Sequence, residues 1–117
     1  MVRCRVLAAF SLALLGCIGC TSRADDLRRA QASFSEARYE DVDVWVAALA
    51  SDVARMKPLE RAQYYYLAGM SAYRMGERPR ARHALALCRA QLELSGSALA
   101  PHDQRNLQSA LEDLAKN

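Results

Sequence analysis

The feature that most constrains this fold is the spacing of its apolar residues, which recur every three or four positions from residue 24 almost to the end. This spacing follows one face of an α-helix. The helix-breaking residues Gly and Pro number only 5 and 3 in 117 residues. The pattern predicts one all-α domain of five helices, over residues 24–39, 41–57, 59–75, 78–94 and 101–116.

Breaking and capping residues stand at the expected helix ends. Asp41 is suited to begin the second helix as its N-cap, and Pro58 ends it because the residue before a proline avoids helical angles. Gly76 is suited to close the third helix, and Ser95, Gly96 and Ser97 close the fourth. The last helix, after Pro101, has only a narrow apolar stripe, which is typical of an end cap.

A basic start and a short apolar run precede the helical region. Arg3 and Arg5 come before the run from Val6 to Leu15. Its length suits the central part of a signal peptide, and it is far short of the roughly 20 residues that span a bilayer. The segment therefore predicts export of the chain.

The four residues Leu14, Leu15, Gly16 and Cys17 resemble the bacterial lipobox. In such a motif the thiol accepts a diacylglyceryl group, and the small residue before it admits the signal peptidase. The expected division is a signal peptide over 1–16, a lipidated tether over 17–23 and a helical domain over 24–117. Cys20 is an alternative lipidation site, and an ordinary cleavage site at Ser22–Ala24 is another alternative.

The resemblance implies a bacterial lipoprotein that meets the membrane through its lipid anchor. In enterobacterial lipoproteins, an Asp after the modified cysteine favours the inner membrane. Here Ile18 or Thr21 would follow that cysteine. The expected location is therefore the outer membrane, facing the periplasm, with the inner membrane as the lesser alternative.

The charge balance excludes nucleic acid as an expected partner. Without Arg3 and Arg5, 14 Lys and Arg face 13 Asp and Glu, so the exported chain would be nearly neutral. Cys88 lies within an apolar helical pattern and is expected to be a small core residue. If Cys17 carries the lipid, Cys20 remains as a thiol that could pair with Cys88 or with another chain.

The stretch from Tyr64 to Cys88 resembles a tetratricopeptide repeat, in which small residues let two antiparallel helices cross closely. The small positions are filled by Gly69, Ala72, Gly76 and Ala81. Arg78 departs from the pattern, because an aromatic residue usually stands there. A shift of about 35 residues gives a weaker earlier copy, pairing Phe34, Ala37, Val46, Ala50 and Val53 with Gly69, Ala72, Ala81, Leu85 and Cys88. The expected fold is therefore two such helix hairpins with a C-terminal capping helix.

The resemblance implies a groove for a protein partner along the first helix of each hairpin. Counted from Gly69, the groove residues of the second hairpin are Gln63, Tyr66, Met70, Tyr73 and Arg74, and the earlier copy adds Arg28, Gln31, Ser35 and Arg38. The same register turns Tyr65 toward the second helix. An aromatic stripe at helical spacing is also typical of a core, so Tyr66, Met70 and Tyr73 are either groove or core.

Other polar residues give no chemical signature. Arg78, Arg82 and Arg89 share one helix face, which is either solvated or a surface for an acidic partner. His83 and His102 have no metal-ligating neighbours at the usual spacing, so no metal is expected. No nucleophile with a base, catalytic residue or cofactor-binding loop stands out, so an enzyme is not expected.

Three function classes follow in order. The first is a membrane-anchored protein-interaction module, which could form a homo-oligomer. The second is an assembly lipoprotein similar to the pilotins that escort secretin or pilus subunits. The third and most remote is a lipoprotein enzyme.

Overall fold

A computed structural model describes residues 22–116 of the protein. The expected signal peptide and both candidate lipidation sites, Cys17 and Cys20, lie outside these residues. The described part contains helices and no strand, which confirms the all-α prediction. Its elements are α1 (Arg23–Ser35), α2 (Tyr39–Leu49), the 3₁₀-helix η1 (Ala50–Arg55), α3 (Pro58–Arg74), α4 (Arg78–Ser95) and α5 (Pro101–Leu114).

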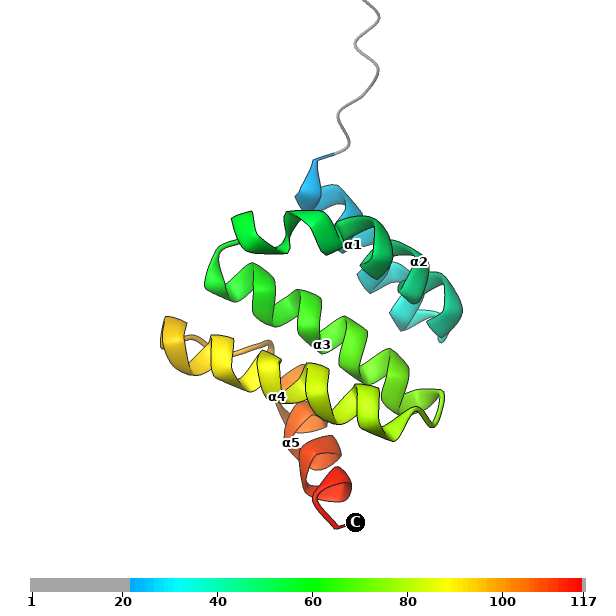
Figure 1. Ribbon diagram of the computed structural model, residues 1–117, viewed down its shortest axis with the longest axis vertical. Coiled ribbons are helices and arrows are strands. Elements are labelled where there is room, and N and C mark those ends of the chain that lie inside the picture. Colours follow the sequence, from blue (N-terminus) through cyan, green and yellow to red (C-terminus); the bar gives the residue numbers. More distant parts are fainter. Residues whose placement is uncertain (1–21, 117) are drawn as a thin grey trace, which may run out of the picture.

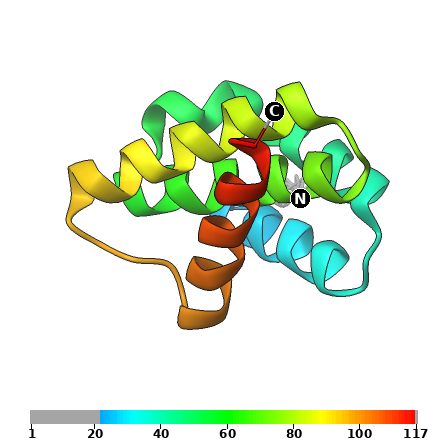
Figure 2. The same cartoon turned by 90° about the horizontal axis from the view of Figure 1, so that it is seen from below.

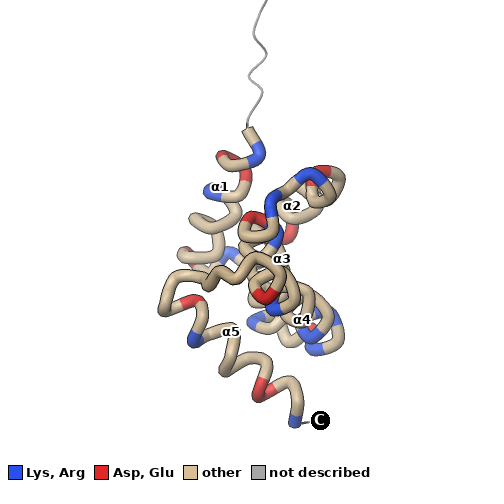
Figure 3. The backbone as a smooth tube through the Cα atoms, turned by 90° about the vertical axis from the view of Figure 1, so that its left-hand side faces the viewer, with Lys and Arg blue, Asp and Glu red and all other residues tan. Residues whose placement is uncertain are grey.

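The helices form two antiparallel hairpins, α1 with α2 and α3 with α4, followed by α5 (Figure 1). The central helix is α3, which packs against each of the other four. Seen from below and from the side, α1 and α5 lie on one side of α3, while α2 and α4 lie on the other (Figures 2 and 3). Both sides of α3 are thus covered, and the core forms around it.

The two hairpin turns share one backbone conformation. Ala37 and Gly76 both have positive φ, at 56° and 79°. The amide of the next residue bonds back across each turn, from Arg38 N to Ser33 O and from Glu77 N to Ala72 O, each at 2.9 Å. Ala37 is an uncommon residue at such a position, since a side chain in the left-handed region costs about 1–2 kcal/mol.

The shared turn corrects the internal register expected from the sequence. Ala37 and Gly76 are equivalent turn residues whose numbers differ by 39, whereas the expected shift was about 35. The shift of 35 paired Ala37 with Ala72, inside α3, because no glycine marks the first turn. The observed shift instead pairs the fully buried Ala30 with Gly69.

The first two helices also differ from their expected bounds. The left-handed turn at Ala37 ends α1 at Ser35, four residues before the expected end at residue 39. The next helix, α2, begins at Tyr39 with Arg38 as its N-cap, so Asp41 is not the cap. Its carboxylate instead accepts a hydrogen bond from Arg38 Nη1 at 3.0 Å. From Ala50 the expected second helix continues as η1, and Met56 is extended.

α3 and α4 approach each other closely where they cross at Gly69. A Cβ atom on Gly69 would lie 2.6 Å from Leu85 Cδ2 and 3.1 Å from the Leu85 backbone nitrogen. Ala72 and Ala81 are fully buried beside it. The expectation that small residues mark a close crossing here is therefore met. The close crossing explains why a glycine stands in the middle of a helix despite its low helix propensity.

Candidate functional site

Tyr66 and Met70, two of the five expected groove residues, lie in the core. Each is 1 % exposed. The Tyr66 ring lies edge-on to Phe34 of α1, with 6.1 Å between ring centroids. Its hydroxyl donates to Asp103 Oδ1 at 3.2 Å and accepts from Asn106 Nδ2 at 3.4 Å. Tyr66 therefore joins α1, α3 and α5, and burial raises its pKa to about 12.

Tyr73 is half-buried and holds the other end of α5. Its hydroxyl donates to Asp113 Oδ2 at 3.0 Å, and Arg78 Nη1 donates to the same oxygen at 3.0 Å. The bond from Arg78, followed by that from Tyr73, lowers the pKa of Asp113. The bond to this carboxylate raises the pKa of Tyr73. Arg74, the last expected groove residue of α3, is exposed.

Two of the three arginines that were expected on one face of α4 also bind α5. Arg78 Nη2 donates to the Asp113 carbonyl at 3.1 Å, and Arg82 Nη2 donates to the Leu114 carbonyl at 2.9 Å. Both groups end the α5 helix, where free carbonyls and the helix dipole favour a cation. Arg89, the third residue of the face that was expected to be either solvated or available to an acidic partner, is exposed.

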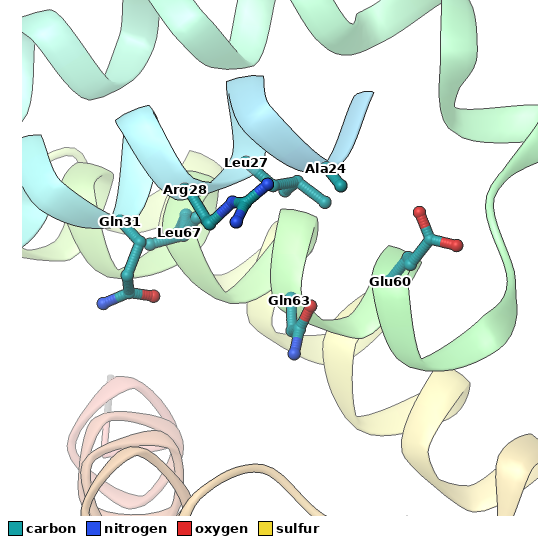
Figure 4. A pocket seen from close by; sticks show the side chains of 7 residues that line it. All are labelled: Ala24, Leu27, Arg28, Gln31, Glu60, Gln63 and Leu67. Carbon is teal, nitrogen blue, oxygen red and sulfur yellow. The ribbon is translucent and has the colours of Figure 1, made fainter. Parts of the chain in front are cut away.

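A hollow of about 320 Å³ opens between α1 and α3, near the N-terminal end of both helices (Figure 4). Leu27 and Leu67 give it an apolar floor, and both are buried. Most of its other residues are polar in type, although the surface that lines the hollow is mainly apolar. The residues that line it are Ala24, Leu27, Arg28, Gln31, Glu60, Gln63 and Leu67.

The structure thus brings together three residues that the sequence assigned to a groove, Arg28, Gln31 and Gln63. Arg28 pairs with Asp25 one turn before it. The other two residues of the earlier copy are elsewhere. Ser35 bonds to the Gln31 carbonyl at 3.0 Å, and Arg38, in the turn between α1 and α2, pairs with Glu36 and Asp41.

Four residues of the hollow were not identified from the sequence, namely Ala24, Leu27, Glu60 and Leu67. Leu27 and Leu67 belong to the apolar stripes of their helices, and a stripe does not show which of its members border a gap. Glu60 accepts a bond from Lys57 N at 3.5 Å at the start of α3 and pairs with Arg23 Nε at 3.4 Å. The place of Glu60 in the first turn of α3 is typical of an acidic residue. Its pairing with Arg23, however, depends on how α1 lies on α3.

Within 22–116, no group of three or more His, Cys, Asp or Glu is placed to hold a metal ion. The Cys88 thiol is fully buried, and burial raises its pKa to about 12, so it is protonated near neutral pH. No helix between Arg23 and Leu114 is both long and apolar enough to cross a membrane.

Comparisons with known proteins give no relative from which a role could be transferred. No protein-family model, curated protein or solved structure significantly matches the chain.

Proposed function

We propose that this protein is a bacterial lipoprotein whose helical domain is a protein-interaction scaffold, held at the periplasmic face of the outer membrane. The observation that carries the proposal is the sequence from Leu14 to Cys17, with a helical domain that begins only a few residues later, at Arg23. An acylated N-terminus holds a protein at a membrane without a spanning helix.

The start of α1 favours lipidation over an ordinary cleavage after Ala24. Ser22 is the N-cap of α1, and its side chain accepts a bond from Asp25 N at 3.3 Å. Cleavage at Ser22–Ala24 would remove this cap and the first residues of the helix, at a cost of about 1 kcal/mol for the cap alone. Cleavage before Cys17 leaves α1 whole.

The tetratricopeptide-like part of the proposal is supported by two features of the hairpins. Both have the same turn, and the second has a glycine at its helix crossing, as in that family. The missing aromatic residue at Arg78 is the main departure, and this side chain holds α5 instead. Repeats of this kind bind segments of other proteins along their first helices.

We place the partner site at the hollow between α1 and α3. Its floor can take an apolar side chain, while Gln31 and Gln63 offer both donors and acceptors to a peptide backbone. Charged groups of both signs on its walls, Arg28 and Glu60, favour no strongly charged ligand. The fitting partner is a protein segment with one apolar residue among neutral polar ones.

The second candidate function is an assembly lipoprotein similar to the pilotins, for which the proposed location and the helical-repeat fold are the precedent, although those examples have more repeats. Co-purification with a secretin or a pilus subunit would support this role. Activity on a small substrate would instead support the remote third class, a lipoprotein enzyme.

For the anchor, we expect Cys17 to be the N-terminal residue of the mature chain and to carry the lipid. Mass spectrometry of the mature N-terminal peptide measures this directly, and Cys17→Ser should abolish the modification. An acylated peptide that starts at Cys20 would move the site by three residues. An unmodified N-terminus near Asp25 would contradict the lipoprotein proposal.

For the scaffold, we expect a photocrosslinking amino acid at Gln63 to capture a protein partner in intact cells. Gln63 is exposed and lines the hollow, so the substitution should leave the fold intact. The matched control carries the same amino acid at Glu40, which is exposed on α2 and away from the hollow. Equal capture at both positions, or none at Gln63, would contradict the site.

A further inference from the structure

The outer face of α5 borders a second hollow, of about 440 Å³, between α5 and α4. A different face of α5 packs in the core through Leu107, Ala110 and Leu114, each at most 2 % exposed. The hollow continues from that apolar face toward solvent. It is lined by Arg89, Gln104, Leu107, Gln108, Leu111, Glu112 and Ala115.

The position of the hollow indicates that a helix would fill it. Along the chain, α3 packs on both α1 and α2, and α5 packs on both α3 and α4. The next helix in such an alternation would run antiparallel to α5 and pack on it, as α4 packs on α3, and the hollow lies beside α5. Terminal units of helical stacks need a neighbour to cover this kind of face.

The sequence of α5 carries a seam for a helical neighbour. Gln104, Gln108, Leu111 and Ala115 follow one another at spacings of four, three and four, the spacing at which one helix contacts another in a coiled coil. Leu111 is half-buried, and Gln108 and Ala115 are exposed. The seam is short and mostly polar, so the association that it supports is modest.

Two oppositely charged residues flank this seam, and each is placed to pair with the other one on a second copy of α5. Arg105 and Glu112 are exposed and seven residues apart, so they lie on the same side of α5. If two α5 helices pair antiparallel about a point between Gln108 and Ser109, Arg105 of each copy faces Glu112 of the other. Glu112 bonds within its own helix only to Gln108, at 3.1 Å, and is available for such a pair.

We propose that the hollow between α4 and α5 is the interface of a two-fold dimer, filled by α5 of a second copy. A two-fold pairing uses the same surface on both copies and forms each charge pair twice. The dimer does not depend on the proposed partner site or on lipid attachment.

The test is sedimentation equilibrium of the full-length protein in detergent, over a wide range of protein concentration. We expect the wild-type protein to dimerise reversibly. Glu112→Arg and Arg105→Glu each turn two attractive pairs into two repulsive ones, so each should weaken the dimer about tenfold. The double variant Arg105→Glu/Glu112→Arg restores opposite charges and should dimerise within about threefold of the wild type.

The matched control is Glu40→Arg, which makes the same charge change on the exposed surface of α2. All the substituted residues are exposed, and circular dichroism should show unchanged helix content. A wild-type protein that stays monomeric throughout would overturn the proposal. So would equal weakening by Glu40→Arg, or a double variant that is as weak as the single ones.

Discussion

Tyr66→Ala is expected to lower the free energy of unfolding by about 3–5 kcal/mol, the range for a fully buried aromatic side chain. The substitution removes the ring that packs edge-on against Phe34. It also removes the hydroxyl that binds Asp103 and Asn106, and so loosens the start of α5. Chemical denaturation followed by circular dichroism measures the change.

Two variants separate burial from hydrogen bonding at this position. Tyr66→Phe keeps the ring and should cost only about 1–2 kcal/mol, because Asp103 and Asn106 are half-buried and can turn to water. Tyr65→Ala should cost less than Tyr66→Ala, since Tyr65 is half-buried. A larger loss for Tyr65→Ala would restore the assignment of Tyr66 to an open groove.

Gly69→Val is expected to destabilise the domain by about 3 kcal/mol, at the upper end of the range for overpacking a core. Even the first added carbon would lie 2.6 Å from Leu85 Cδ2 and 2.7 Å from Leu85 Cγ. The Leu85 tip could turn aside, but its backbone nitrogen, at 3.1 Å, moves only with α4. The same denaturation experiment measures the loss, and Gly69→Ala should give a smaller one because alanine favours the helix.

A compensating change at Leu85 tests the cause. Leu85→Ala alone should cost about 2–5 kcal/mol, since Leu85 is fully buried. In the double variant Gly69→Val/Leu85→Ala the new side chain occupies part of the space left by Leu85. Its total loss should therefore be clearly smaller than the sum of the two single losses. A purely additive result would show that the helix crossing does not limit the size of residue 69.

Helix content was predictable from the sequence because apolar period and proline position are local signals. Pro101 begins the last helix as expected, and Pro58, which was expected to end the second helix, begins α3. Gly76 ends the turn after α3. The first hairpin turn was misplaced because Ala37 has no sequence signal for a positive φ. Its conformation is imposed by the packing of α1 on α2, and this error carried through to the internal register.

The site was only partly predictable for a different reason. The register from Gly69 identified Gln63, and that residue does line the hollow between α1 and α3. The same register assigned Tyr66 to the groove, whereas its aromatic stripe left a core position open, and its burial follows from the path of α5. That path depends on contacts between residues far apart in the chain, such as Tyr73 and Arg78 with Asp113, which spacing alone does not reveal.

The chain enters the domain at one end of the molecule, and α5 and the C-terminus lie at the opposite end (Figure 1). The segment between Cys17 and Ser22 can reach at most about 17 Å, so a bilayer that held Cys17 would lie close to α1. Antiparallel pairing through α5 would then point the two attachment sites in opposite directions. Such a pair could not rest both anchors on one flat membrane patch. If the protein is both lipid-anchored and dimeric through α5, the dimer would instead bridge two facing membrane surfaces or form only before anchoring. Membrane geometry would then control assembly.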